Sequence, residues 1–159
     1  MATKLLSVLF AATLFSLASC GKQQAETPAV EATANDAPAA MPRTTSPDGA
    51  SVYFITPADG ATVASPVNVE FGIEGMDVVA AGVNEAHSGH HHLLVDTGLP
   101  DLGLPIPADA KHIHFGDAST ATELSLEPGT HTLQLLLGDH LHIPHDPPVT
   151  SQQITVVVE

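Results

Sequence analysis

Hydrophobic and polar residues alternate along most of the chain after residue 50, and glycine or proline interrupts the alternation at short intervals. This pattern predicts short β-strands joined by turns. No stretch keeps a helical period for more than a turn or two, and residues 76–83 are expected to form at most a short helical piece. The predicted strands cover residues 51–56, 67–73, 90–96, 111–115, 121–127, 131–137 and 152–158.

About seven strands in a segment of this length predict an all-β domain, an immunoglobulin-like antiparallel β-sandwich over residues 50–159. One local feature supports this fold. The stretch Glu127–Leu133 resembles the corner of such sandwiches at which an aromatic side chain, two residues before a core position, hydrogen-bonds back to the preceding turn. His131 occupies that position, and we therefore expect it to have a structural role.

The first residues are typical of a signal peptide. An apolar run from Leu5 to Leu17 follows Lys4, and it is too short to span a membrane. It ends in Leu17-Ala18-Ser19-Cys20-Gly21, which resembles the lipobox of bacterial lipoproteins. This resemblance implies removal of residues 1–19 and lipidation of Cys20, the only cysteine, with ordinary secretory cleavage as the alternative. Gly21 replaces the aspartate that signals inner-membrane retention, which favours the periplasmic side of the outer membrane.

Residues 20–49 are rich in Ala, Pro, Thr and Glu, which predicts a disordered tether between the lipid and the domain. The chain after residue 20 carries 18 acidic residues against Lys22, Arg43 and Lys111, a net charge of −15 with neutral histidines. This charge argues against binding to nucleic acid or to an anionic membrane surface and favours cations as partners. Acidity also keeps a surface protein soluble without any ligand.

The ten histidines are the outstanding feature of the domain, and three pairs have the spacing His-x-His. Alternate side chains of an extended strand share one face about 6.6 Å apart, so two such imidazoles can converge on one ion. Ile113 and Phe115 are expected to face the core, which places the histidines at 112 and 114 on the opposite face. Leu93 and Val95 are likewise expected to face the core, which places residues 90 and 92 on the opposite face. His91 is expected to be packed on the core side.

These patterns predict a site for a divalent transition metal. Imidazole suits Zn(II), Cu(II) or Ni(II) and disfavours Cu(I), and a location outside the cytoplasm makes Cu(II) or Zn(II) the practical candidates. The ligands need not all serve one ion, and Asp139 is expected either to bind directly or to support a ligand. The candidate ligands are His90, His92, His112, His114, His140, His142, His145 and Asp139.

The domain resembles a family of bacterial secreted proteins known as domain of unknown function 4399. The resemblance implies kinship and no particular activity. It covers nearly the whole of residues 50–158, in order. It rests on residues 52–60 (VYFITPADG), 89–96 (GHHHLLVD), 105–108 (PIPA), 112–116 (HIHFG), 129–135 (GTHTLQL), 138–140 (GDH) and 143–148 (IPHDPP).

The sequence favours metal binding, with buffering, delivery or resistance as its use, but other functions are also compatible with it. The runner-up is a structural or interaction module, in which the histidines form a hydrogen-bonded network and the domain docks a partner of the cell envelope. Sensing of pH by the histidines is a third interpretation, but it does not explain the His-x-His spacing. No catalytic motif is recognisable. Copper-zinc superoxide dismutase is also a histidine-rich sandwich, but residues 50–159 contain no arginine to guide an anionic substrate.

Overall fold

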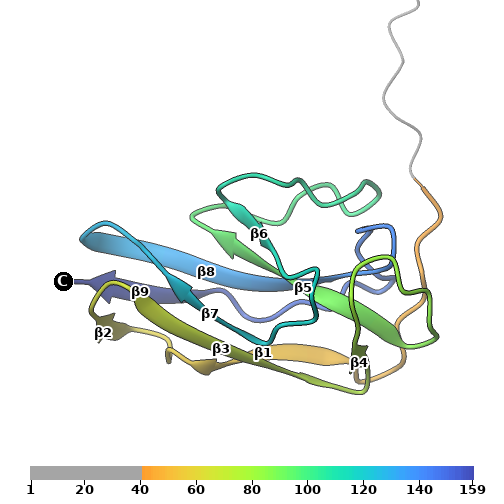
Figure 1. Ribbon diagram of the computed structural model, residues 1–159, viewed down its shortest axis with the longest axis horizontal. Coiled ribbons are helices and arrows are strands. Elements are labelled where there is room, and N and C mark those ends of the chain that lie inside the picture. The colour runs from red at the N-terminus through yellow and green to blue at the C-terminus, as the bar shows by residue number, and fades with distance from the viewer. Residues whose placement is uncertain (1–40) are drawn as a thin grey trace, which may run out of the picture. The chain divides into compact units, whose positions relative to one another are not determined.

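The structure is a computed structural model that describes residues 41–159 (Figure 1). The expected signal peptide, the expected lipidation site Cys20 and most of the predicted tether lie outside these residues. The described residues form nine β-strands and no α-helix, and they contain no helix with the length and hydrophobicity that a membrane crossing requires. The strands are β1 (Ser51–Thr56), β2 (Ala61–Val63), β3 (Val67–Glu74), β4 (Asp77–Val78), β5 (Ser88–Val95), β6 (His112–His114), β7 (Ala121–Leu124), β8 (Gly129–Gly138) and β9 (Ile154–Val158).

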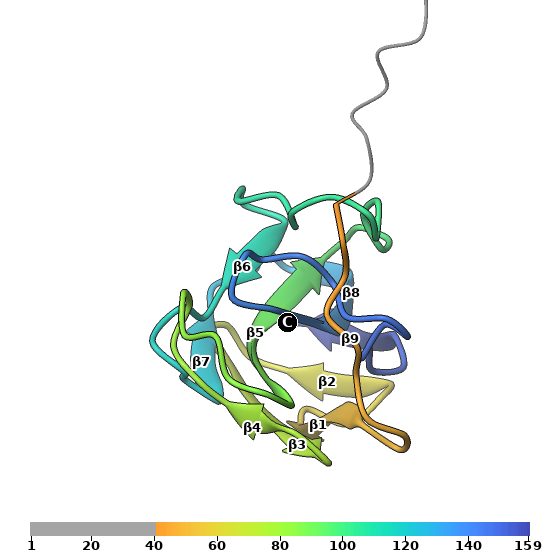
Figure 2. The same ribbon diagram turned by 90° about the vertical axis from the view of Figure 1, so that its right-hand side faces the viewer.

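The strands form two sheets that face each other, as Figure 2 shows. One sheet has the order β1-β3-β7, and the other has the order β2-β9-β8-β5, with β4 and β6 both paired to β5. These orders correspond to the A-B-E and C-F-G sheets of an immunoglobulin-like sandwich. The predicted all-β sandwich is therefore confirmed. The two additional strands, β2 and β4, have three and two residues and pair in parallel with β9 and β5. Strands this short show no readable alternation.

The core lies between the sheets, and its largest side chains include Phe71 from β3, Leu93 from β5, and Leu133 and Leu135 from β8. Strand β5 is buried along its whole length, because its outer face is covered as well. On that outer face Leu94, Ile106 and Leu136 form a second, smaller apolar cluster. A side chain that points outward from β5 is therefore still shielded from water, which is unusual for an antiparallel sheet.

The corner before β8 has the predicted hydrogen bond. The Nε2 atom of His131 lies 2.9 Å from the carbonyl oxygen of Glu127, and its Nδ1 atom lies 2.7 Å from a carboxylate oxygen of Asp96. The hydrogen bond to Asp96 raises the pKa of His131. His131 thus takes the structural role that the sequence predicts, with an imidazole in place of the usual tyrosine.

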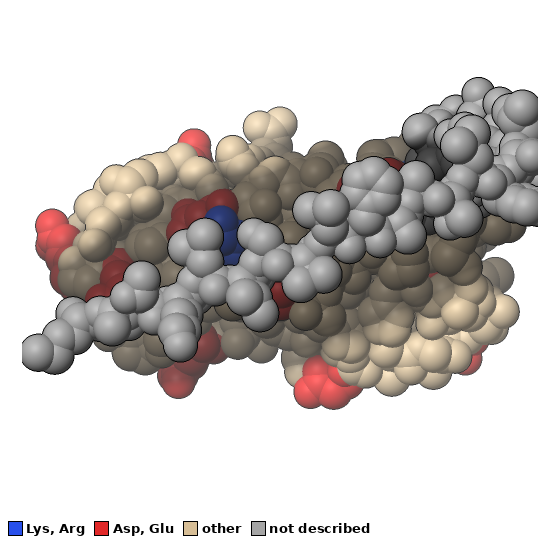
Figure 3. Space-filling view, turned by 90° about the horizontal axis from the view of Figure 1, so that it is seen from above, with Lys and Arg blue, Asp and Glu red and all other residues tan. Residues whose placement is uncertain are grey.

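The packed part of the chain begins before residue 50, earlier than the composition predicts. The amide of Met41 donates to the carbonyl of Gly103, and that of Ser46 donates to the carbonyl of Asp146. Arg43 also lies against the domain, so Lys111 is not the only basic residue there. Acidic side chains are spread over the face that Figure 3 shows, among mostly uncharged residues.

Candidate metal centre

Strands β5 and β6 place three histidines side by side. His90 and His92 alternate with core residues along β5, and both side chains point to the covered outer face, as the strand phase predicts. The antiparallel pairing of β5 with β6 sets His92 opposite His114. The ring centroids of His92 and His114 are 5.0 Å apart, and those of His90 and His114 are 4.9 Å apart. Two neighbouring strands thus supply three imidazoles to one place.

A fourth imidazole, that of His142, comes from the turn after β8. One carboxylate oxygen of Asp139 accepts hydrogen bonds from the backbone amides of Leu141 and Ile143, at 2.8 and 3.0 Å. The amide of His142 donates to the carbonyl of Asp139, and His142 has a left-handed backbone with φ of 65°. The carboxylate therefore closes a tight turn, which brings the ring of His142 to 4.8 Å from those of both His90 and His114.

The four rings form a compact cluster, which we call the histidine cluster (His90, His92, His114 and His142). Each of its six ring pairs has centroids between 4.8 and 5.9 Å apart. The Nε2 atoms of His90 and His92 are 3.1 Å apart, and those of His114 and His142 are 3.2 Å apart. Ligand nitrogens on a tetrahedral zinc ion, with bonds of 2.0–2.1 Å, lie about 3.3–3.4 Å from one another. The Nε2 atoms within each of these two pairs therefore have nearly the spacing of neighbouring ligands on such an ion.

Three members of the histidine cluster satisfy a stricter criterion. One ring nitrogen from each of His90, His114 and His142 lies within 4.8 Å of the other two, an arrangement that can hold a metal ion. His90 and His92 are fully buried, whereas His142 is partly exposed and His114 is exposed. The cluster therefore has an interior half fixed on β5 and an outer half in contact with solvent.

Two glycines leave the space that the rings occupy. A Cβ atom at Gly138, which pairs with His90 across β5 and β8, would lie 2.9 Å from the Nε2 atom of His92. A Cβ atom at Gly116 would overlap with the Cε1 atom of His114. Neither glycine has a left-handed backbone, so what these positions require is room for an imidazole. The role of these two residues cannot be recognised from the sequence, because a glycine gives no sign of which side chain it makes room for.

The surroundings of His90, His92 and His114 lower the pKa of all three imidazoles and so favour their neutral forms. Burial, together with neighbouring histidines, lowers the pKa of His90 to about 4 and that of His92 to about 2. Burial also lowers the pKa of His114, and the nearby imidazole of His142 adds to this effect. A metal ion binds the neutral form of imidazole, so at neutral pH these rings are already in the form that an ion requires.

The other predicted ligands have different partners. The Nδ1 atom of His112 lies 2.8 Å from a carboxylate oxygen of Asp109, which holds that ring apart from the cluster. His145 is buried beneath β5, and its Nε2 atom donates to the carbonyl of Ser88 at 3.1 Å. His140 lies in the turn that Asp139 closes, and it makes no ring contact with the cluster within the described part of the chain. The spacing of His140 and His142 had suggested a shared face, but that inference required an extended backbone, which this turn does not have.

Asp139 supports the cluster from behind. Its second carboxylate oxygen accepts a hydrogen bond of 2.7 Å from the hydroxyl of Thr44, and the residue as a whole is 2% exposed. Burial alone would raise the pKa of Asp139. The hydrogen bonds from the hydroxyl of Thr44 and from the amides of Ile143 and Leu141 lower it overall, so the carboxylate is charged. With the amides of residues 141 and 143 on its other oxygen, Asp139 orients the turn that carries His142.

Comparison with known proteins identifies a family and no function. A family model described as "Domain of unknown function (DUF4399)" matches residues 69–159, a segment that contains every member of the histidine cluster. No curated protein and no solved structure matches the chain. The interpretation of the cluster therefore rests on its own geometry.

Proposed function

The chain belongs to the family described as Domain of unknown function (DUF4399), and for this member we propose that the histidine cluster binds one divalent transition metal ion. The observation that carries this proposal is the mutual contact of all four rings, from three segments of the chain, with pairs of Nε2 atoms 3.1 and 3.2 Å apart. Isolated histidines on a polar face have no reason to converge in this way, because each can bond to water or to the backbone.

Zinc is the ion that the geometry supports best. The Nε2 atoms of His90 and His92, and those of His114 and His142, are spaced nearly as neighbouring ligands are in the tetrahedral geometry that Zn(II) adopts with nitrogen ligands. Copper(II) prefers a square-planar or tetragonal arrangement and ranks second for that reason. The chain offers no thiolate in residues 41–159, so imidazole is the ligand chemistry available here.

The same geometry favours binding and transfer of the ion over catalysis. A catalytic zinc site keeps a position open for water or substrate, whereas with His92 as the fourth ligand beside His90, His114 and His142 the proposed site has a complete tetrahedral shell. The outer half of the cluster, His114 and His142, is in contact with solvent, which gives an ion a route in and out. We propose buffering, delivery or resistance as the use of this site, in a protein held at the periplasmic side of the cell envelope through Cys20.

A structural histidine network, which would leave the domain as an interaction module, has less support. In such a network the buried ring nitrogens would all have hydrogen-bond partners. Among the described residues, the Nδ1 atoms of His90, His91, His92 and His145 and the Nε2 atom of His91 are buried without one. Within the histidine cluster, such a network would therefore consist of the Nε2 pairs alone, with the Nδ1 atoms of His90 and His92 left unpaired.

Competitive titration calorimetry of the full chain with Zn(II) and Cu(II) tests the proposal. We expect one Zn(II) ion per chain with a dissociation constant below about 1 μM, or roughly −8 kcal/mol. Two matched variants locate the site, because His112 and His114 lie on one strand and only His114 belongs to the cluster. H114A should weaken binding by at least about 100-fold, more than the loss of a supporting hydrogen bond causes at metal sites. H112A should change it little.

Weak binding of several ions, unaffected by H114A, would contradict the proposal. That behaviour is typical of any histidine-rich surface. Equal losses of zinc affinity in H112A and H114A would instead indicate that the ion binds elsewhere on β6.

A further inference from the structure

Residues 41–47 form a segment that we call the strap. It lies beside the loop of residues 139–147, as the orange and blue ribbons of Figure 2 show. The amide of Asp146 donates to the carbonyl of Thr44, and the amide of Ser46 donates to the carbonyl of Asp146. The hydroxyl of Ser46 donates to the carbonyl of Pro147 at 2.7 Å. The strap thus runs parallel to this part of the loop, with one isolated β-bridge between Thr45 and Asp146.

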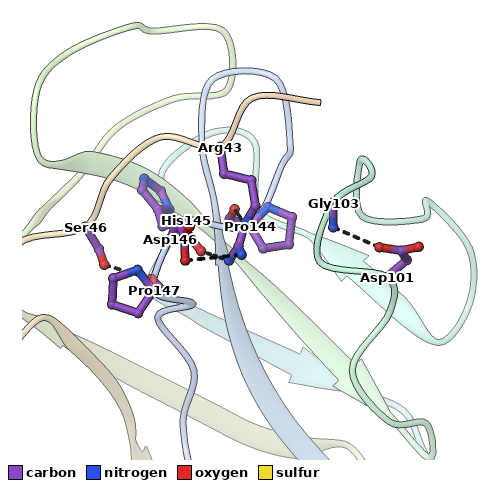
Figure 4. Close-up of polar contacts among 8 residues, drawn as sticks. All are labelled: Arg43, Ser46, Asp101, Gly103, Pro144, His145, Asp146 and Pro147. Carbon is purple, nitrogen blue, oxygen red and sulfur yellow. Dashed lines mark hydrogen bonds and ion pairs between the residues drawn. The ribbon is translucent and has the colours of Figure 1, made fainter. Parts of the chain in front are cut away.

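Arg43 is the main attachment of the strap, and Figure 4 shows its guanidinium group between three successive residues of the loop. The Nε atom donates to the carbonyl of Pro144 at 2.9 Å, and another guanidinium nitrogen donates to the carbonyl of His145. The third nitrogen lies 3.3 Å from a carboxylate oxygen of Asp146. One side chain therefore holds the backbone of the loop just after His142.

Thr44 holds the other end of the same loop. Its hydroxyl donates to the carboxylate of Asp139, the group that also accepts the amides of Leu141 and Ile143. The strap therefore contacts the loop on both sides of His142, through Asp139 before it and residues 144–147 after it. The remaining members lie on β5 and β6, where sheet hydrogen bonds fix the backbone.

We propose that the strap is a latch on the metal centre: while it is docked it holds His142 in the cluster, and its detachment frees the loop and releases the ion. This inference rests on the proposed function. It follows that a pull or a binding partner acting on the chain before residue 41 controls how long the ion is retained. Since coupling between two sites is reciprocal, a bound ion must also hold the strap more firmly in place.

Measurement of the release rate tests the latch. The full chain is loaded with Zn(II) and mixed with excess chelator, and the rate of transfer is followed by stopped flow. R43A should release the ion about tenfold faster than the unaltered chain, and T44V, which replaces the hydroxyl with a methyl group, about threefold faster. K111A is the matched control, because Lys111 is the other basic residue of the described chain and does not belong to the strap. It should change the rate less than twofold.

A second readout does not depend on the metal. In the metal-free chain, R43A and T44V should speed hydrogen exchange at the amides of Leu141 and Ile143 and leave exchange in the middle of β8 unchanged. This measurement also shows whether each variant is folded. If R43A and T44V release the ion and exchange their amides at the rates of K111A, the latch is overturned and the proposed metal site is not affected. An unaltered chain that takes up no ion overturns the proposed function and the latch, whatever the exchange data show.

Discussion

Two histidine environments in this domain differ in almost every respect. At the corner before β8, both ring nitrogens of His131 have oxygen partners, Asp96 and the carbonyl of Glu127, and its pKa is raised. In the histidine cluster the Nε2 atoms face one another, and burial lowers the pKa of His90 and His92. The first environment stabilises a protonated ring and the second a neutral one. The partners of the ring nitrogens, and not the number of histidines, therefore distinguish a structural residue from a candidate ligand.

The largest expected effect is on the pH dependence of stability without metal. His90 and His91 have a pKa of about 4 in the folded chain and the ordinary 6.5 when unfolded. The unfolded chain therefore binds more protons below pH 6.5, and stability falls as the pH falls. Each residue contributes on the order of 2 kcal/mol between pH 7 and pH 5. The contribution of His131, whose pKa is raised, has the opposite sign: it is complete below pH 6.5 and is lost as the pH rises through the folded value.

Urea denaturation with a chelator present, between pH 5 and pH 8, measures this difference. A free energy of unfolding that stays constant from pH 7 to pH 5 would show that folding does not lower the pKa of the buried imidazoles. The contrast with His131 would then be contradicted.

The next largest effect comes from filling the space beneath the cluster. G138A places a methyl group 2.9 Å from the Nε2 atom of His92, and this buried ring has nowhere to move. We expect zinc affinity to fall about 100-fold and the metal-free fold to lose roughly 1–3 kcal/mol through overpacking. G98A is the matched control, because no atom lies within 4 Å of a Cβ at that position. If G138A binds zinc as tightly as G98A does, His92 is not a ligand.

Removal of the corner imidazole should affect the fold and not the ion. H131F keeps an aromatic ring but loses the hydrogen bonds to Asp96 and to the carbonyl of Glu127. We expect the free energy of unfolding to fall by about 1–2 kcal/mol, with zinc stoichiometry and affinity unchanged. H131Y should recover part of the loss, since its hydroxyl can donate to the same carbonyl. A loss of zinc affinity in H131F would mean that the two environments are coupled.

The smallest effect separates the two faces of β5. His91 points into the core, where its ring lies 4.6 Å from that of Phe71 and neither ring nitrogen has a partner among the described residues. H91L replaces a buried polar group that makes no hydrogen bond with an apolar one. Thermal unfolding should show a stability gain of about 1 kcal/mol, and zinc binding should not change. A marked loss of stability would indicate that His91 has a hydrogen-bond partner, such as a buried water.

Most of the fold and the strand half of the site could be predicted from the sequence. The alternation of Leu93 and Val95 with His90 and His92 fixes which face each side chain takes, and the same holds for Ile113 and His114. Packing against a core leaves a period of two in the sequence wherever a strand is long enough. Such periodicity cannot show that β5 and β6 are neighbours, which depends on pairing between residues far apart in the chain.

The loop half of the site could not be predicted in this way. Asp139 turns the backbone so that His140 and His142 do not share a face, and Asp109 holds the ring of His112. Aspartate side chains often accept hydrogen bonds from nearby backbone amides and so favour turns. Asp139 and Asp109 therefore indicate turns in the sequence, and the His-x-His spacing does not take these turns into account. Arg43 gave none, because a segment rich in alanine and proline has the composition of a tether whether or not it packs.

X-ray absorption spectroscopy at the zinc edge of the loaded full chain shows directly whether the histidine cluster binds the ion. We expect four nitrogen ligands at about 2.0–2.1 Å, with the multiple-scattering pattern of imidazole rings, and one histidine ligand fewer in H114A. A first shell made mainly of oxygen, or a spectrum that H114A does not change, would contradict this expectation.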